Sequence, residues 1–542
     1  MRRILLWGVS LAAGSMGLTA AEPVFTHVHP AGVQAGTTSL VSFAGKFDPW
    51  PCQVHTAEPG LRFVPQKDPG TFEVTVDASM VPGPCLLRAF NGEGASGPVA
   101  LMITGTPQTL ESEPNDDFRA PQVLTSTIAT INGRLDKGDD VDSYQVTMTK
   151  GRTLVAWVEA HVLAAGCDAM LRVIDDHGLT LAFNHDGPAT MDPLLVFTAP
   201  EDGTYFVQIM GHKYPAASEI RFAGGKDCVY RLHLSTGPVV RNLWPLAAPR
   251  EGLMSVEGWN LPVNRIAADS HPIMLYPPRP SCPVELADFV ESPILNAPCA
   301  VSGRIANAGA EDRYSFKAAK GETLELAITG PALGSEIDPW VKVLNAEGKE
   351  LAVNDDAGGS TEARLVWTAP EEGSYRAVVG DLTQRGGADF YYRLALTHPV
   401  PGVKATTDHA FKVQAGQTTA VKVGVVFTDG FAVPLTLNAG SLPPGVTAAA
   451  VPVPAKGGEV TISLTADATA AGSSQPFQLL LTSNPAGQEH PVRHGMVSSS
   501  ENNGVPQGFR QLLIPETSEL WLTVTAAPEE KKDTASPAPA KP

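Results

Sequence analysis

The chain has 542 residues and a formal net charge of −18 at pH 7. One hydrophobic core cannot organise a chain of this length, so we expect roughly three to five domains. The negative charge disfavours nucleic acid and anionic lipid surfaces as partners, because both are polyanions. The 51 glycines and 47 prolines favour short strands and many turns over long helices. We therefore predict an all-β protein built of tandem β-sandwich domains.

Residues 1–21 have the three parts of a secretory signal peptide. Arg2 and Arg3 precede an apolar stretch from Ile4 to about Leu18, and small residues follow up to Ala21. The apolar stretch is short for a membrane anchor, and no later stretch is apolar enough to span a bilayer. We expect the mature protein to be exported to the periplasm, the cell surface or the medium, without membrane insertion.

Residues 22–105 alternate apolar and polar side chains in short runs between turn clusters, which predicts the strands of a β-sandwich. The stretch from His29 to Thr38, followed by Gly45-Lys46-Phe47, resembles the start of an immunoglobulin-like domain of the TIG type. A truncated echo of this pattern lies at Leu243-Trp244-Pro245 and at 258–261. We therefore expect a shortened TIG-like unit or a connecting β segment over 238–280.

The most informative pattern is a duplication with a constant offset of 170 residues. Its strongest element, 198–205, returns as 368–375, with the Thr-Ala-Pro-Glu-x-Gly-x-Tyr pattern kept in both copies. Such a repeat predicts one folding unit copied twice, here over 108–237 and 281–398. Tyr205 and Tyr375 are expected to be structural tyrosines at a corner of each sandwich.

Both copies resemble the bacterial pre-peptidase C-terminal (PPC) domain family. The resemblance is carried in the first copy by 111–116, 133–135, 139–144, 202–205 and 230–232, and in the second by Gly303, Asp312, Tyr314, Gly373, Tyr375 and 392–394. It implies a jelly-roll β-sandwich of a kind that is appended to secreted peptidases and that binds substrate in some collagenases. No peptidase domain accompanies the two copies in this sequence.

Acidic residues gather in two segments of the first copy. Crowded carboxylates repel one another without a cation, and calcium requires six to eight hard oxygen ligands. The resemblance implies one structural calcium site whose ligands are Glu111, Glu113, Asn115, Asp116, Asp139 and Asp142. The alternative is a solvated acidic linker followed by an acidic turn.

The second copy lacks most of these oxygen atoms. Gly309 and Ala310 replace Asp139 and Asp140, whereas Asp312 keeps the place of Asp142. The segment 285–288 stands in place of 113–116 with few of its ligands. We therefore expect one calcium site and not two.

Residues 400–525 read as a last immunoglobulin-like β domain, with Leu442-Pro443-Pro444-Gly445-Val446 similar to a turn of bacterial surface proteins. Residues 526–542 are polar and rich in Pro and Ala, which predicts a disordered tail.

The six cysteines formally allow 15 pairings, and export would permit disulfides. Their grouping along the chain suggests sequential pairs, namely Cys52–Cys85, Cys167–Cys228 and Cys282–Cys299. Zinc binding is the competing interpretation, and the lack of a Cys-x-x-Cys pattern disfavours it.

No catalytic motif was found: the sequence contains no Gly-x-Ser-x-Gly, His-Glu-x-x-His or phosphate-binding glycine loop. The segments 184–187 and 354–357 suit tight turns better than ligand clusters. For the tryptophans Trp50, Trp244, Trp259 and Trp340, core packing is the default expectation and ligand contact the alternative. We expect a non-catalytic binding or scaffolding protein whose partner is an extracellular polymer or an envelope protein. Two alternatives are an accessory partner of a separate secreted peptidase and an enzyme with an unrecognised site.

Overall fold

The computed structural model describes residues 21–187, 190–215, 218, 220–246, 253–267, 294–357, 361–483, 487–496 and 512–527. Within these ranges the chain consists of strands and two short 3-10 helices, η1 (His161–Leu163) and η2 (Pro331–Leu333), so the all-β prediction is confirmed. The same ranges contain no helix long and apolar enough to cross a membrane. The predicted signal peptide apart from Ala21, the segment 268–293 and the tail from 528 onward lie outside the described residues.

The first sandwich packs two sheets with the strand orders β1-β3-β6-β5 and β2-β9-β7-β4, and β8 pairs with β7. Its core is rich in aromatic rings, with Phe25 stacked on Phe43 at a centroid distance of 4.0 Å. The strands are β1 (Val24–His29), β2 (Gly32–Gln34), β3 (Thr38–Lys46), β4 (Gln53–His55), β5 (Leu61–Pro65), β6 (Thr71–Val76), β7 (Gly83–Asn91), β8 (Gly94–Ala95) and β9 (Val99–Thr104).

The first copy of the repeat is a sandwich of two five-stranded sheets, β10-β12-β19-β14-β17 and β11-β13-β18-β15-β16. Its strands are β10 (Thr109–Leu110), β11 (Gln122–Val123), β12 (Ile128–Arg134), β13 (Asp142–Met148), β14 (Thr153–Glu159), β15 (Cys167–Ile174), β16 (Thr180–Asn184), β17 (Leu194–Thr198), β18 (Gly203–Lys213) and β19 (Val229–Ser235).

The second copy has the sheets β24-β31-β26-β29 and β23-β25-β30-β27-β28, which repeat the order of the first copy apart from β10. Its strands are β23 (Ile294–Leu295), β24 (Cys299–Arg304), β25 (Asp312–Ala318), β26 (Thr323–Thr329), β27 (Pro339–Leu344), β28 (Glu350–Asn354), β29 (Arg364–Thr368), β30 (Gly373–Asp381) and β31 (Tyr391–Thr397).

The two copies have the same strand register. Asp142 pairs with Ile209, and Asp312 pairs with Val379, so both partners keep the offset of 170. In the last strand Tyr230 corresponds to Tyr392, an offset of 162, because the second copy is eight residues shorter between β30 and β31. Tyr205 and Tyr375 each donate a hydrogen bond to the carbonyl oxygen four residues earlier, at 2.9 and 2.7 Å, as expected for structural corner tyrosines.

A three-stranded sheet lies between the copies, and a further two-sheet domain follows the second. The connecting sheet has the order β20-β21-β22, and the last domain has the sheets β32-β34-β38-β36 and β33-β43-β39-β35-β37, with β40 beside β39 and the pair β41-β42 apart. Their strands are β20 (Val239–Trp244), β21 (Leu253–Trp259), β22 (Arg265–Ala267), β32 (Gly402–Thr406), β33 (Ala410–Gln414), β34 (Thr418–Thr428), β35 (Leu435–Gly440), β36 (Val446–Ala448), β37 (Val451–Pro452), β38 (Gly458–Ala466), β39 (Ser473–Ser483), β40 (Glu489–Pro491), β41 (His494–Gly495), β42 (Glu516–Thr517) and β43 (Leu520–Thr525).

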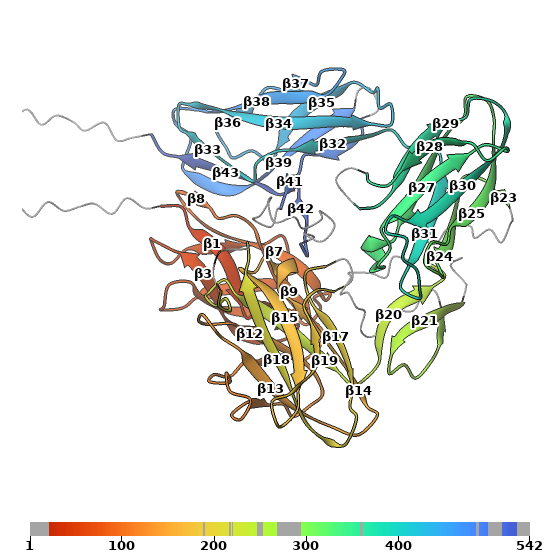
Figure 1. The fold of residues 1–542 in the computed structure, drawn as a ribbon. Coiled ribbons are helices and arrows are strands. Elements are labelled where there is room, and N and C mark those ends of the chain that lie inside the picture. Colours follow the sequence, from red (N-terminus) through yellow and green to blue (C-terminus); the bar gives the residue numbers. More distant parts are fainter. Residues whose placement is uncertain are drawn as a thin grey trace, which may run out of the picture.

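The last domain lies against the first, so the domains form a closed ring (Figure 1). Buried Arg88 donates to the backbone oxygen of Glu519 at 3.0 Å and to His409 Nδ1 at 3.1 Å. Burial and the nearby Arg88 charge lower the pKa of His409 to about 4, so its neutral ring can accept that bond. The ring of Phe90 packs on Trp521 at a centroid distance of 5.0 Å.

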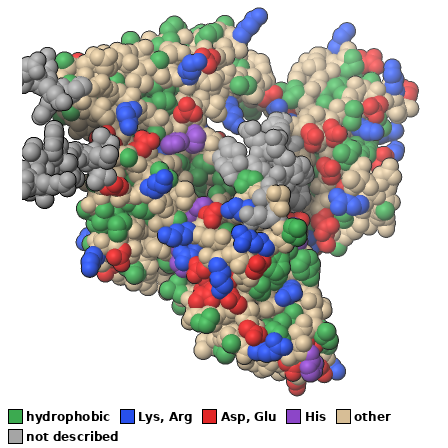
Figure 2. Space-filling model, turned by 60° about the vertical axis from the view of Figure 1, so that its left-hand side comes forward, with side chains coloured by type: hydrophobic (Ala, Val, Ile, Leu, Met, Phe, Trp, Pro, Cys, Tyr) green, Lys and Arg blue, Asp and Glu red, His purple; other side chains and the backbone are tan. Residues whose placement is uncertain are grey.

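Acidic and basic side chains are interspersed over the face drawn in Figure 2, with no continuous basic surface there.

The disulfide prediction is wrong for the described cysteines, which are Cys52, Cys85, Cys167, Cys228 and Cys299. All five are buried free thiols, while Cys282 lies outside the described residues. Cys85 Sγ donates to the backbone oxygen of Leu101 at 3.3 Å. The two thiols of Cys167 and Cys228 are neighbours, and the hydrogen bond between them, together with burial, raises the pKa of Cys167. These thiols act as small apolar side chains within the cores.

A buried ion pair lies on the outer face of the first repeat. Arg231 and Glu159 are bonded to each other with side chains only 3% and 2% exposed, and His233 Nε2 lies 3.4 Å from Glu159. Burial alone would raise the pKa of Glu159, but the charges of Arg231 and His233 outweigh it and lower the pKa to about 2. The folded pKa is thus below the unfolded value of about 4.3, so the pair stabilises the fold above that pH and loses its effect as the pH falls toward 2.

Replacing Arg231 by Met should lower the free energy of unfolding of this repeat by about 3–5 kcal/mol, because the Glu159 charge then stays buried without its main partner. Thermal unfolding at pH 7 measures the loss. The double variant Glu159→Gln/Arg231→Met serves as control and should recover part of it. An Arg231→Met protein as stable as the parent would contradict this assignment.

Candidate functional site

Loop residues before β13 bring four carboxylates of the first repeat together. Ligand oxygens of Glu113, Asp116, Asp140 and Asp142 lie within 4.8 Å of one another. Because β10 pairs in parallel with β12, the acidic segment that follows β10 lies near the start of β13. There the amide of Ser143 donates a hydrogen bond to the Asn115 carbonyl oxygen at 3.1 Å. Backbone hydrogen bonds therefore fix both acidic segments relative to the start of β13.

Glu111 joins this cluster through a pair of buried tyrosines. Tyr230 OH donates to Asp142 Oδ2 at 2.5 Å, and Glu111 Oε1 lies 3.1 Å from the same hydroxyl. Tyr144 OH lies 2.5 Å from Tyr230 OH. Tyr230 reaches this position by crossing Gly133, where a Cβ atom would lie 2.2 Å from the tyrosine Cζ. The glycine therefore determines where the tyrosine, and with it Asp142, is held.

The cluster holds more negative charge than its hydrogen bonds can satisfy. Asn115, Asp140 and Asp142 are at most 1% exposed, and the Oδ1 atom of each has no hydrogen-bond donor. Burial, then the contact with Glu111, raises the pKa of Asp142 to about 11. Burial, then the contact with Asp116, raises that of Asp140 to about 6. The nearest cation is the half-exposed Lys137, whose Nζ lies 2.7 Å from Asp116 and 3.5 Å from Asp140.

Hard oxygen donors with a surplus of buried negative charge fit a divalent cation such as calcium. A bound ion would give the Oδ1 atoms of Asn115 and Asp142 a positive partner and would add to the weak contact of Asp140 Oδ1 with Lys137. It would also favour the charged forms that burial and neighbouring carboxylates disfavour. Glu111, Glu113, Asn115, Asp116, Asp140 and Asp142 are the side chains able to hold it. We call these six residues the acidic cluster.

Five of the six residues predicted from the sequence belong to the acidic cluster, and Asp139 does not. Asp139 is exposed with a φ of 66°, and its Oδ1 accepts a hydrogen bond from the amide of Phe222 at 3.1 Å. Asp140 contributes its carboxylate instead. Residues two apart on an extended chain face the same side, so the spacing of Asp140 and Asp142 was the signal that could have identified it.

In the second copy the tyrosine framework remains without the surrounding acidic residues. Tyr392 OH donates to Asp312 Oδ2 at 2.7 Å and lies 2.8 Å from Tyr314 OH. Ala310 stands in the place of Asp140, and the segment 285–288 lies outside the described residues. Burial raises the pKa of Asp312, while the hydrogen bonds from Tyr392 and from the Arg304 backbone oppose this rise.

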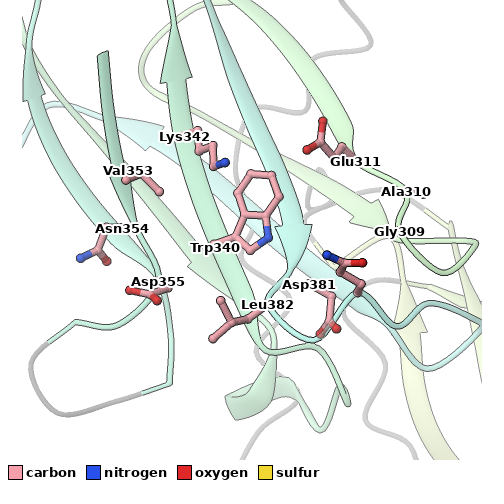
Figure 3. A pocket seen from close by; sticks show the side chains of 11 residues that line it. Gly309, Ala310, Glu311, Trp340, Lys342, Val353, Asn354, Asp355, Asp381 and Leu382 are labelled. Carbon is pink, nitrogen blue, oxygen red and sulfur yellow. The ribbon is translucent and has the colours of Figure 1, made fainter. Parts of the chain in front are cut away.

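A groove of about 510 Å³ lies on the outer face of the second copy (Figure 3). Along β27 the buried residues Val341 and Val343 point inward, which turns Trp340 and Lys342 outward. The indole crosses Gly380 of β30, where a Cβ atom would lie 2.3 Å from Trp340 Cζ2. The other lining residues are Gly309, Ala310, Glu311, Val353, Asn354, Asp355, Asp381, Leu382 and Gln384.

The Trp340 groove combines an aromatic face with polar side chains on several sides. Lys342 Nζ lies 4.5 Å from the centre of the Trp340 ring, a cation–π contact. Asp381 is fully engaged, since it accepts bonds from the Asp338 and Arg385 amides and from the Thr383 hydroxyl. Glu311, Asp355 and Gln384 are exposed, and Glu311 Oε2 accepts a hydrogen bond from Arg313 at 2.8 Å.

No family model and no curated protein sequence matches the chain. Among solved structures, it is similar to the pre-peptidase C-terminal domain of collagenase from Bacillus anthracis, with 14% identity over 19% of this chain and 92% of that one, and a TM-score of 0.16. It is also similar to the M60 catalytic domain with the CBM51-1 and CBM51-2 domains of ZmpB from Clostridium perfringens (9% identity, 73% and 56% covered, TM-score 0.13). A third is the D1–D4 ectodomain fragment of ICAM-5 (13% identity, 86% and 96% covered, TM-score 0.13). None of these scores reaches 0.5, so the site assignment depends on the geometry of the chain itself.

Asp142→Asn should change the pH dependence of stability in metal-free protein. The folded pKa of Asp142, about 11, exceeds the unfolded value of about 3.9, so this carboxyl favours folding most below pH 4 and progressively less as the pH rises. The asparagine side chain does not titrate, so the free energy of unfolding of the variant should fall less than that of the parent between pH 5 and 8. Thermal unfolding in chelator measures both proteins, and parallel pH profiles would refute the assignment.

Proposed function

We propose that the protein is an exported, non-catalytic binding protein that recognises a polysaccharide of the cell envelope or its surroundings through the Trp340 groove. The observation that carries this proposal is the partly exposed indole held flat over Gly380 within a polar-rimmed groove. Calcium at the acidic cluster stabilises the first repeat. The two copies thus share one scaffold and have different tasks.

A carbohydrate chain suits the chemistry of the Trp340 groove. The apolar face of a sugar ring packs on an indole, and its hydroxyl groups need donors and acceptors around that face. Lys342 supplies donors, Glu311 and Asp355 supply acceptors, and Gln384 supplies both. The groove is formed on the outer side of a rigid sheet, so little ordering of the protein accompanies binding.

The first copy provides a natural comparison for the Trp340 groove. Met170 and Met210 pair across the strands where Trp340 and Gly380 pair in the second copy, and Met170 is buried. With a methionine side chain in place of the glycine, a flat aromatic surface cannot form there. We therefore assign polysaccharide binding to the second copy alone.

Trp340→Ala should weaken binding of the mature protein to its insoluble polysaccharide by about 2 kcal/mol, roughly 30-fold, because the aromatic contact surface is removed. Co-sedimentation with a panel of purified cell-wall and extracellular glycans measures binding. Met170→Ala is the matched control and should leave it unchanged. Retention of a peptidase from the native exoproteome, with no glycan bound, would favour the accessory role instead, and turnover of a panel substrate would favour an enzyme.

Calcium titration of metal-free protein should show one high-affinity equivalent that depends on the acidic cluster. Asp140→Asn should abolish it, because a buried anionic ligand is lost, and should also remove the rise in unfolding temperature that calcium produces. Asp312→Asn in the second copy is the matched control and should keep both effects. Isothermal calorimetry and thermal unfolding give the two readouts, and equal binding by Asp140→Asn and the parent would overturn the calcium assignment.

A further inference from the structure

A second group of potential metal ligands lies at the end of β16, and none of its residues belongs to the acidic cluster. The turn after Asn184 carries His185 and Asp186 back toward Asp168, near the start of β15. His185 Nε2 lies 3.2 Å from Asp168 Oδ2, and His185 Nδ1 lies 3.8 Å from Asp186 Oδ2. One donor atom from each of the three residues falls within 4.8 Å of the others.

The segment 184–187 begins with the last residue of β16 and bends at His185, and it brings ligand atoms together. Asn184 closes β16, and Gly187 forms an isolated bridge with Thr190. From the sequence alone, a tight turn and a ligand cluster were alternatives for this segment. Asp168 is distant in sequence, and its position beneath the turn follows from the pairing of β15 with β16.

Two buried oxygen atoms at this place have no hydrogen-bond donor. They are Asp168 Oδ1 and Asn184 Oδ1. Burial raises the pKa of Asp168, Asp186 raises it further, and His185 acts in the opposite direction. A bound cation would supply the positive partner that these two oxygen atoms lack.

We propose that Asp168, His185 and Asp186 form a binding site for a divalent transition-metal ion of the zinc class. An imidazole nitrogen with two carboxylate oxygens is a donor set that such ions prefer, whereas calcium takes oxygen ligands alone. One doubly charged ion would balance the two carboxylates. This site is independent of the acidic cluster and of the proposed polysaccharide binding.

His212 is placed to complete the coordination. It pairs with Asp168 across β15 and β18, and its exposed ring lies 6.4 Å from the His185 ring, perpendicular to it. An exposed side chain can change rotamer at little cost, so His212 can supply a second nitrogen. The result is the four-ligand set of two histidines and two carboxylates that suits tetrahedral zinc.

The second copy has lost both nitrogen donors at the same positions. Asp338, Asp355 and Asp356 replace Asp168, His185 and Asp186, and Leu382 replaces His212. Burial, then Asp356, Asp381 and Asp355, raise the pKa of Asp338, while Arg385 lowers it. The copies therefore differ in metal preference at this turn, and the first copy alone is suited to zinc.

The test is zinc titration of the full mature chain, freed of metal and then saturated with calcium so that the acidic cluster is occupied. The parent should bind zinc with one equivalent that is lost, or weakened at least about 100-fold, in His185→Gln and in Asp168→Asn. His177→Gln is the matched control, because His177 and Asp176 form an ordinary surface pair, 80% and 70% exposed, at the opposite end of the β15–β16 hairpin. It should bind zinc as the parent does.

Cobalt absorption spectra supply a second readout, since tetrahedral nitrogen and oxygen coordination gives intense visible bands. The parent and the Asp140→Asn variant should show them, and His185→Gln should not. Unfolding temperatures in chelator confirm that each variant is folded. Unchanged zinc stoichiometry and affinity in both His185→Gln and Asp168→Asn would overturn the proposal, as would a parent that binds no zinc.

Discussion

Both repeats depend on one hydrogen bond. It joins a tyrosine of the last strand of the repeat to an aspartate at the start of β13 or β25. Tyr230 with Asp142, and Tyr392 with Asp312, join the two sheets of each sandwich at one end. The tyrosine reaches the aspartate only because a glycine lies beneath its ring, at Gly133 or Gly303. Burial makes the charged form of such a carboxyl group costly, because water does not screen it there, and the pKa of both aspartates is raised.

The two copies handle that buried charge differently. Among the described residues of the second copy, Ala310 stands in the place of Asp140, and Tyr392 donates a hydrogen bond to Asp312. In the first, Glu111 and Asp140 add further carboxylates, and the pKa of Asp142 rises to about 11. The calcium binding that we propose would offset this cost and would link metal affinity to folding stability in the first copy. The duplication thus separates the tyrosine–aspartate framework, which both copies keep, from the additional carboxylates of the first copy.

The sequence predicted the features that depend on local pattern. Alternation and turn residues were sufficient for the all-β fold, and the repeat offset was sufficient for the shared register of the copies. Which of Asp139 and Asp140 enters the acidic cluster depends on a φ of 66° at Asp139, which composition does not encode. The disulfide prediction relied on spacing along the chain, whereas bonding depends on sulfur geometry, and the described thiols remain free. The site at His185 needed the pairing of β15 with β16 to be known.

Cross-strand pairs explain why one scaffold can carry different surfaces. At the pair Met170–Met210 both side chains fill the outer face, while at Trp340–Gly380 one side chain covers both positions. Neither change alters the inward residues, since Leu171 and Val341 are both fully buried. Period-two alternation makes the outer face free to vary without a cost to the core. Because a Cβ atom at position 380 would lie 2.3 Å from Trp340 Cζ2, the indole can cross this strand only where the strand carries a glycine.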